Sequence, residues 1–178
     1  MTSYEQIAAD FHRRIDCIAG AVDHLAPALE QAAELLARAV LEDRKILVCA
    51  CGTDEGLGTY LAGLLRTGDL GPAMPALAFG DAAIAGEGTD MWRDLRTLSR
   101  DGDVLLCLDT NADAPLATRC AEFARQRNLL AINLSDAGTA TDGLSIPLIA
   151  PDEGLRKELA LMAAHSLRDQ VWKHLLGE

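Results

Sequence analysis

The stretch KILVCACGT, residues 45–53, is a short apolar run followed at once by small residues. A continuous apolar run of this length is typical of a strand that is buried on both faces of a parallel sheet. Small residues continue through 50–56 and lead into a helix predicted near Leu57–Arg66. This succession of strand, loop and helix predicts an α/β fold.

The same succession recurs along the rest of the chain. Further strands are predicted at 76–79, 103–108, 129–134 and 144–149, and further helices at 90–98, 115–127 and 153–176. Strands that alternate with helices predict a five-stranded parallel sheet in a three-layer α/β/α sandwich. Ligands of such sheets bind beyond the carboxyl ends of the strands, which here are the loops 50–56, 80–88, 109–114 and 135–143.

Two amphipathic helices are predicted ahead of the first strand. The first has apolar residues three and four apart between Ile7 and Val22, and the second has the same spacing between Leu29 and Val40. We expect a break at Ala26-Pro27, because a proline disfavours helix at the residue before it.

Composition excludes several classes of protein. The 178 residues include 16 Lys and Arg against 27 Asp and Glu, a net charge of −11, so an electrostatic nucleic-acid binder is not expected. No apolar stretch is long enough to span a membrane, and Met1–Asp10 does not resemble a signal peptide, which predicts a cytoplasmic protein. The cysteines are odd in number and scattered, and we expect buried free thiols at Cys17, Cys49, Cys51, Cys107 and Cys120.

At residues 45–65 and 103–114 the chain resembles a sugar isomerase (SIS) domain. GDVLL at 102–106, and its spacing from KILVC, carry the likeness best. The closest subgroup is the phosphoheptose isomerases, together with the related DnaA initiator-associating proteins. The resemblance implies a single SIS domain over 1–178 with a flavodoxin-like strand order. It also implies a homotetramer or homodimer, with a helical pair at 1–42 used in oligomerisation and an α/β core at 43–178.

Both loops that bind phosphate in this family are altered here. The family's first loop reads roughly Gly-Asn-Gly-Gly/Thr-Ser, whereas residues 50–54 read ACGTD, and its second reads Ser-Thr-Ser-Gly-Asn-Ser, whereas residues 109–114 read DTNADA. Carboxylates replace hydroxyls, and two like charges about 4 Å apart repel by roughly 1 kcal/mol in water and about 4 kcal/mol at an effective dielectric of 20. We therefore expect Asp54, Glu55, Asp109 and Asp113 to crowd the phosphate position. The candidate ligand-binding residues are Cys51, Gly52, Thr53, Asp54, Asp109, Thr110, Asn111 and Asp113.

The positions that carry the isomerase chemistry are altered as well. The resemblance implies that the family has a His and a Glu where this chain has Tyr60 and Leu64. It likewise implies a Gln and a His where this chain has Lys157 and His165. The family's Asn-Asp pair falls near 83–84 and is missing. One ligand of four is too few for zinc, so no metal or cofactor is expected. His165 is the one candidate catalytic residue, and its alternative is an inherited helix residue near a subunit interface.

Three functions follow as hypotheses. The first is an oligomeric binding or regulatory protein on an SIS scaffold, without isomerase activity, that contacts another protein or a sugar derivative. The second is an active isomerase of sedoheptulose 7-phosphate with a rearranged site, using His165 with Glu158 or an acidic loop residue. The third is an acidic cleft for a cationic or unphosphorylated ligand, for which a solvated cleft without a ligand is the plain alternative.

Overall fold

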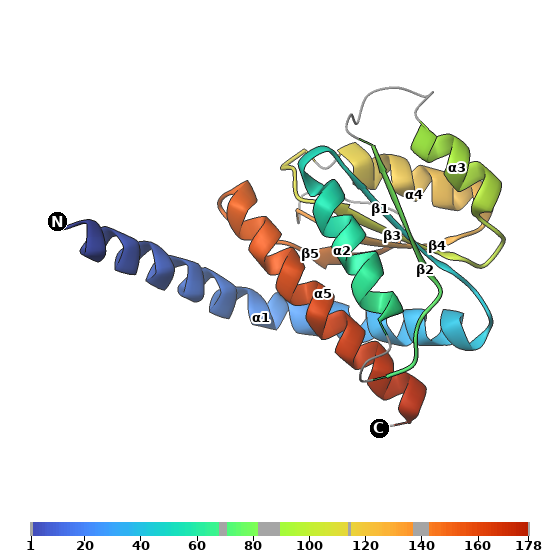
Figure 1. Ribbon diagram of the computed structural model, residues 1–178, viewed down its shortest axis with the longest axis horizontal. Helices are drawn as coiled ribbons and strands as arrows, with labels where there is room; N and C mark the ends of the chain where they lie inside the picture. The colour runs from blue at the N-terminus through green and yellow to red at the C-terminus, as the bar shows by residue number, and fades with distance from the viewer. Residues whose placement is uncertain (1, 68–70, 82–89, 114, 137–142, 178) are drawn as a thin grey trace.

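A parallel sheet of five strands forms the centre of the molecule (Figure 1). The computed structural model describes residues 2–67, 71–81, 90–113, 115–136 and 143–177. Within them the strand order is β2-β1-β3-β4-β5, which confirms the predicted flavodoxin-like order. The strands are β1 (Ile46–Cys51), β2 (Ala76–Asp81), β3 (Val104–Asp109), β4 (Leu130–Ser135) and β5 (Leu144–Pro147).

Helices cover both faces of the sheet and make the predicted three layers. Along β1 and β3, alternate side chains enter two separate cores, as strand geometry requires. One core lies beneath α1 (Ser3–Leu41), α2 (Glu55–Arg66) and α5 (Glu153–Leu176). The other lies beneath α3 (Asp90–Leu98) and α4 (Pro115–Arg127). Cys49 and Cys107 lie side by side on β1 and β3, and their free thiols face this second core. Cys120 of α4 packs against them.

The predicted break between two N-terminal helices is wrong. A single 39-residue helix, α1, runs through Pro27. An interior proline costs a helix about 3 kcal/mol, but Leu25 and Leu29 on either side of it are both buried, and each buried leucine contributes roughly 1.5–3 kcal/mol. Pro27 itself is exposed, so its ring lies on the solvent side of the helix. Packing on both sides of Pro27 therefore keeps the helix continuous.

The N-terminal half of α1 extends well beyond the body of the molecule as an arm (Figure 1). Three large apolar side chains at successive turns, Ile7, Phe11 and Ile15, are 56–63% exposed. The C-terminal half packs against α5 and contributes to the core beneath the sheet. Within the described residues, none of the helices combines the length and hydrophobicity needed to cross a membrane.

Candidate functional site

Two loops meet at the carboxyl ends of β1 and β3, where the sequence predicts the ligand edge. A 3₁₀ turn, Gly52–Asp54, follows β1 and ends in an Asp54 side chain that is 1% exposed. One carboxylate oxygen of Asp54 accepts the backbone N–H of Thr110 at 2.7 Å, and the other accepts the Thr110 hydroxyl at 2.7 Å. Asp54, at the end of the first loop, is thus bonded twice to Thr110 of the loop after β3.

Lys157 of α5 joins this arrangement from the side. Its Nζ lies 2.5 Å from Glu153 Oε1 and 3.7 Å from Asp54 Oδ1. The Thr53 hydroxyl donates to the same Glu153 oxygen at 3.0 Å. The hydrogen bond from Lys157 and, to a lesser extent, that from Thr53 lower the pKa of Glu153 below its ordinary value. The ammonium is therefore shared between two carboxylates of the chain itself.

Asp109 is buried as well, and its bonds are structural. One carboxylate oxygen accepts the backbone N–H groups of Leu116 at 2.8 Å and Ala117 at 3.2 Å, the first free donors of α4. The other accepts the backbone N–H of Asn111 at 3.3 Å and the Asn111 amide at 3.0 Å. Asp109 and Asn111 therefore hold the loop after β3 on the start of α4.

The four acids expected to crowd the phosphate position differ in their burial. Asp54 and Asp109 are buried, each with its own hydrogen-bond donors. Glu55 and Asp113 are exposed. Cys51 ends β1, is buried on the α3 side, and has its sulfur 3.6 Å from that of Met91. Gly52 follows with a φ of +59°, a left-handed conformation that favours glycine.

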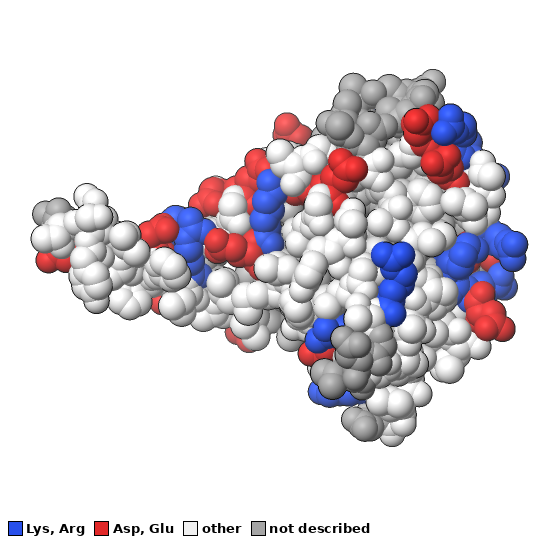
Figure 2. All heavy atoms as spheres, in the orientation of Figure 1, with Lys and Arg blue, Asp and Glu red and all other residues white. Residues whose placement is uncertain are grey.

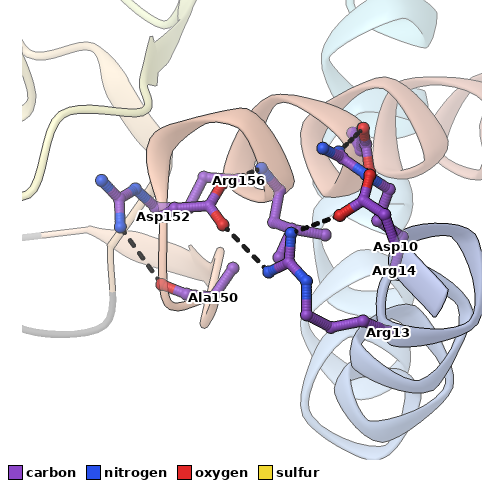
Figure 3. A network of polar contacts seen from close by, with 8 residues as sticks. Asp10, Arg13, Arg14, Ala150, Asp152 and Arg156 are labelled. Carbon is purple, nitrogen blue, oxygen red and sulfur yellow. Dashed lines mark hydrogen bonds and ion pairs between the residues drawn. The ribbon is translucent and has the colours of Figure 1, made fainter. Parts of the chain in front are cut away.

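Arg156 is a member of the site that sequence reasoning missed. Its side chain is almost fully buried, and its Nε donates to the Thr110 carbonyl at 2.5 Å. Its Nη1 donates to the Ala150 carbonyl at 3.2 Å, as Figure 3 shows, and lies 3.6 Å from Asp136 Oδ2. Arg156 fixes the backbone of Thr110, whose N–H meets Asp54. An arginine in the first turns of a helix gives no sequence signal of such a role.

Tyr60 and His165 face each other across α2 and α5. The Tyr60 hydroxyl and His165 Nε2 are 3.0 Å apart, and the ring centres are 5.8 Å apart. Leu64, one turn further along α2, packs against the core. No group of three or more metal-ligating side chains occurs in the described part of the chain. The partner of His165 is thus a phenol, and the Ala83-Ile84 positions lie outside the described residues.

Ion pairs attach the arm to the start of α5 (Figure 3). Asp10 accepts hydrogen bonds from both Arg13 and Arg14, at 2.8 Å each. These bonds lower the pKa of Asp10, and the bond from Arg14 has the larger effect. Arg13 reaches Asp152 at 3.4 Å, and Arg14 pairs with Glu158. Asp152 also caps α5 through the Leu155 N–H at 2.9 Å, which lowers its pKa. Glu158 is therefore engaged with the arm.

Comparison with known proteins identifies the scaffold. The phosphoheptose isomerase of Halorhodospira halophila is 29% identical over 194 residues, which is 99% of this chain and 98% of the relative. That of Methylococcus capsulatus is 29% identical over 195 residues and all of both chains. The chain is thus similar over nearly its whole length to phosphoheptose isomerases, which the SIS-domain resemblance of its sequence predicts. No family model matches it.

Solved structures of phosphoheptose isomerases share the fold of this chain. A phosphoheptose isomerase from Francisella tularensis superposes with a TM-score of 0.79 at 20% identity, over 97% of this chain and all of the other. The phosphoheptose isomerase GmhA from Neisseria gonorrhoeae gives 0.80 at 23% identity, over 96% and 98%. At these identities the likeness establishes the architecture, and the reaction must be argued from the residues of the site.

Proposed function

We propose that this chain is an SIS-scaffold protein without isomerase activity that acts as an oligomeric binding or regulatory protein. One observation supports this above the others. The residues at the positions that the family resemblance assigns to metal and proton transfer have partners within the chain or pack against its core. His165 meets the Tyr60 hydroxyl at 3.0 Å, Lys157 pairs with Glu153 at 2.5 Å, and Leu64 packs against the core.

The chemistry of an aldose–ketose isomerase explains why this matters. Moving a proton between adjacent carbons requires a base, an acid and a group that polarises the carbonyl. His165 is the one retained candidate, and its hydrogen-bond partner is the hydroxyl of Tyr60. Glu158, a potential partner for His165 on the same helix, is paired with Arg14. The described residues provide no metal-binding group that would polarise a carbonyl.

The direct test is conversion of sedoheptulose 7-phosphate by purified protein, followed by NMR with and without added zinc. We expect no conversion above the rate in buffer under either condition. His165→Gln is the matched variant, because it removes the ring nitrogen while keeping a polar side chain. Turnover by the wild-type protein that this variant loses would refute the proposal and assign catalysis to His165.

The second candidate, an active isomerase with a rearranged site, is favoured by the relatives that match over nearly the whole chain. Both relatives are phosphoheptose isomerases by name. In this reading the Tyr60–His165 pair replaces the family's acid and base. It predicts that Tyr60→Phe and His165→Gln both reduce turnover, whereas the first proposal predicts no turnover to reduce.

Self-association belongs to the first proposal. An apolar groove of about 560 Å³ lies between α1 and α5, bordered by side chains such as Val22, Leu25 and Met162. It continues the exposed stripe of the arm, Ile7, Phe11 and Ile15, along the same helix. On the face in Figure 2 the outer arm is mostly uncharged, with charged residues where it meets the body. A second copy, as homodimer or homotetramer, would cover both surfaces.

Light scattering after size exclusion measures this assembly. We expect a mass of two or four chains, and a monomer would refute that part of the proposal. A cytoplasmic location, a further protein partner and a sugar-derivative ligand complete the proposal. Affinity capture from a cytoplasmic extract tests for the protein partner. The control is a variant with a charged residue in the apolar stripe of the arm, which should not self-assemble.

A further inference from the structure

We propose that the outer surface of α3, α4 and the loop after α3 is a docking surface for an acidic segment of a partner protein. Four arginines define this arginine face: Arg96, Arg100, Arg119 and Arg127. The inference rests on the proposed function and deepens it, because it gives the chemistry of the protein partner and the surface that receives it.

The arginine face differs in charge from the rest of the chain. Of the 16 Lys and Arg of the chain, six lie in residues 90–101 and 115–128, together with only four of its 27 Asp and Glu. In the part of the chain that the structure describes, Arg96, Arg100 and Arg127 form no ion pair. An excess of positive charge therefore lies on one face of an otherwise acidic chain.

The arginines of α4 are held against α3. The guanidinium carbon of Arg119 lies 4.8 Å from the centre of the Trp92 ring, and Arg127 Nη2 donates to the Arg96 carbonyl at 2.5 Å. A guanidinium has five N–H donors, so each of these contacts leaves its charge and most of its donors available. Side chains that are ordered before binding lose less conformational freedom when a ligand arrives. Two of the four arginines are therefore prepared for a carboxylate.

Helix stability alone does not explain where these arginines lie. Arg96 and Arg127 are in the last turns of α3 and α4, where a positive charge offsets the helix dipole. Arg100 follows the end of α3, and Arg119 lies in the first half of α4, so the dipole does not favour a cation at either position. A surface that binds an anion accounts for all four positions.

A groove between α3 and α4 lies within the arginine face. It has a volume of about 180 Å³ and is bordered by Trp92, Arg96, Arg119, Glu122, Phe123 and Gln126. The rings of Trp92 and Phe123 are nearly buried and their centres are 5.6 Å apart. Aromatic and arginine side chains are enriched where proteins bind one another. Glu122 is the one acid among these groove residues, and it accepts the Gln126 amide at 3.4 Å.

A short acidic polypeptide fits this surface better than another polyanion. Planar guanidinium groups pair with carboxylates through two parallel hydrogen bonds. Helix α4 has 13 residues and is therefore about 20 Å long, which matches about six residues of extended chain. A nucleic acid would continue onto the neighbouring faces of a chain whose net charge is −11, and repulsion there would oppose its binding.

The arginine face lies on the opposite side of the sheet from the surfaces proposed for self-association. Helices α3 and α4 cover one core, whereas α1 and α5 cover the other (Figure 1). A second copy bound in the groove between α1 and α5 would therefore leave the arginine face accessible. Variants of the arginine face should accordingly change partner binding without changing the mass of the assembly.

The test is binding of a fluorescein-labelled oligoglutamate of about six residues, measured by fluorescence anisotropy at low and at physiological ionic strength. We expect the wild-type protein to bind the peptide, and the affinity to fall as salt is added. Arg100→Glu and Arg127→Glu should each weaken binding, and together by at least about tenfold, which corresponds to about 1.4 kcal/mol. Arg66→Glu is the matched control, because it makes the same change at an exposed arginine of α2, on the other side of the sheet.

Two further variants make the test sharper. Glu122→Gln removes the acid of the groove and should strengthen binding by about twofold. If the double charge reversal does not fold, as judged by circular dichroism, Arg100→Gln/Arg127→Gln replaces it, because it removes both charges without adding new ones. The inference is overturned if the wild-type protein does not bind the peptide at low ionic strength, or if the arginine variants bind it as tightly as Arg66→Glu. It is also overturned if an oligothymidylate of equal charge binds at least as tightly as the peptide.

This outcome is separable from that of the proposed function. Turnover of sedoheptulose 7-phosphate, or the mass of a monomer, would refute parts of the proposed function and leave the arginine face as a binding surface. Failure of the wild-type protein to bind oligoglutamate would refute the docking surface and leave the turnover and mass measurements unaffected.

Discussion

Replacing Asp109 by alanine should lower the free energy of unfolding by about 3 kcal/mol, since its carboxylate caps α4. In the sequence this acid falls at the ligand edge, where its removal would affect binding and leave stability nearly unchanged. In the structure it accepts two N–H groups of α4 and two donors of Asn111. The two interpretations therefore differ in what the substitution changes.

The magnitude follows from these bonds. Loss of a capping side chain costs about 1 kcal/mol, with a range of roughly 0.5–2 kcal/mol. Leaving buried donors in the adjacent loop without an acceptor adds about 1–3 kcal/mol. For a chain of this size each kcal/mol shifts the melting temperature by roughly 2–4 °C, so about 3 kcal/mol corresponds to about 6–12 °C. Asp109→Asn keeps one acceptor oxygen and should lose about half as much.

Thermal unfolding followed by circular dichroism measures the effect. Protein concentration is held fixed, because self-association makes the melting temperature concentration-dependent. Asp113→Ala is the matched control: it removes an exposed acid from the same loop and should change stability by less than about 0.5 kcal/mol. If the melting temperature of Asp109→Ala equals that of this control instead of lying well below it, the carboxylate does not hold the start of α4 and the reasoning is refuted.

Other consequences of the structure are open to similar measurement. All five cysteines lie within the described residues and four are buried, so Ellman's reagent should titrate one thiol in the native protein and none in Cys17→Ser. Phe11→Asp, which charges the arm's apolar stripe, should reduce the mass seen by light scattering to that of a monomer. Pro27→Ala restores a helical N–H and should raise the melting temperature; a drop would mean that the proline is needed where it stands. Hydrogen bonds depress the pKa values of Asp152 and Glu153, so their contribution is present above their ordinary values of 3.8 and 4.5 and is lost on acidification below them; melting temperatures between pH 6 and 3 should show this, with a smaller loss in Asp152→Asn.

The sequence was sufficient for the sheet because its signals are local. Apolar runs bounded by small residues define each strand. The register of β1 with β3 then brings residues 46–50 beside 104–108, as alternating strands and helices require. Helices such as Asp90–Leu98 and Pro115–Arg127 begin and end as predicted. Strand β1 continues to Cys51, two residues further than expected, because these small side chains are also buried.

Prediction from the sequence fails where a local rule competes with packing between segments that are far apart in the chain. Proline at position 27 predicts a break, and the rule itself is sound. What overrides it is contact between α1 and α5, an element more than a hundred residues away. Arg156 illustrates the same limit, since its partners, the carbonyls of Thr110 and Ala150, become neighbours only in the folded chain. Such contacts cannot be obtained from periodicity or spacing.

The candidate site shows why residue types alone do not give its electrostatics. Counting acids at the sheet edge predicts mutual repulsion, and this would follow if the carboxylates faced one another. Instead each buried acid has its own donors: Thr110 for Asp54 and the first turn of α4 for Asp109. A buried carboxylate that receives two or more hydrogen bonds has its acceptor oxygens satisfied within the chain. The acids at the carboxyl ends of β1 and β3 therefore hold the two loops in place, which a count of charges along the sequence does not reveal.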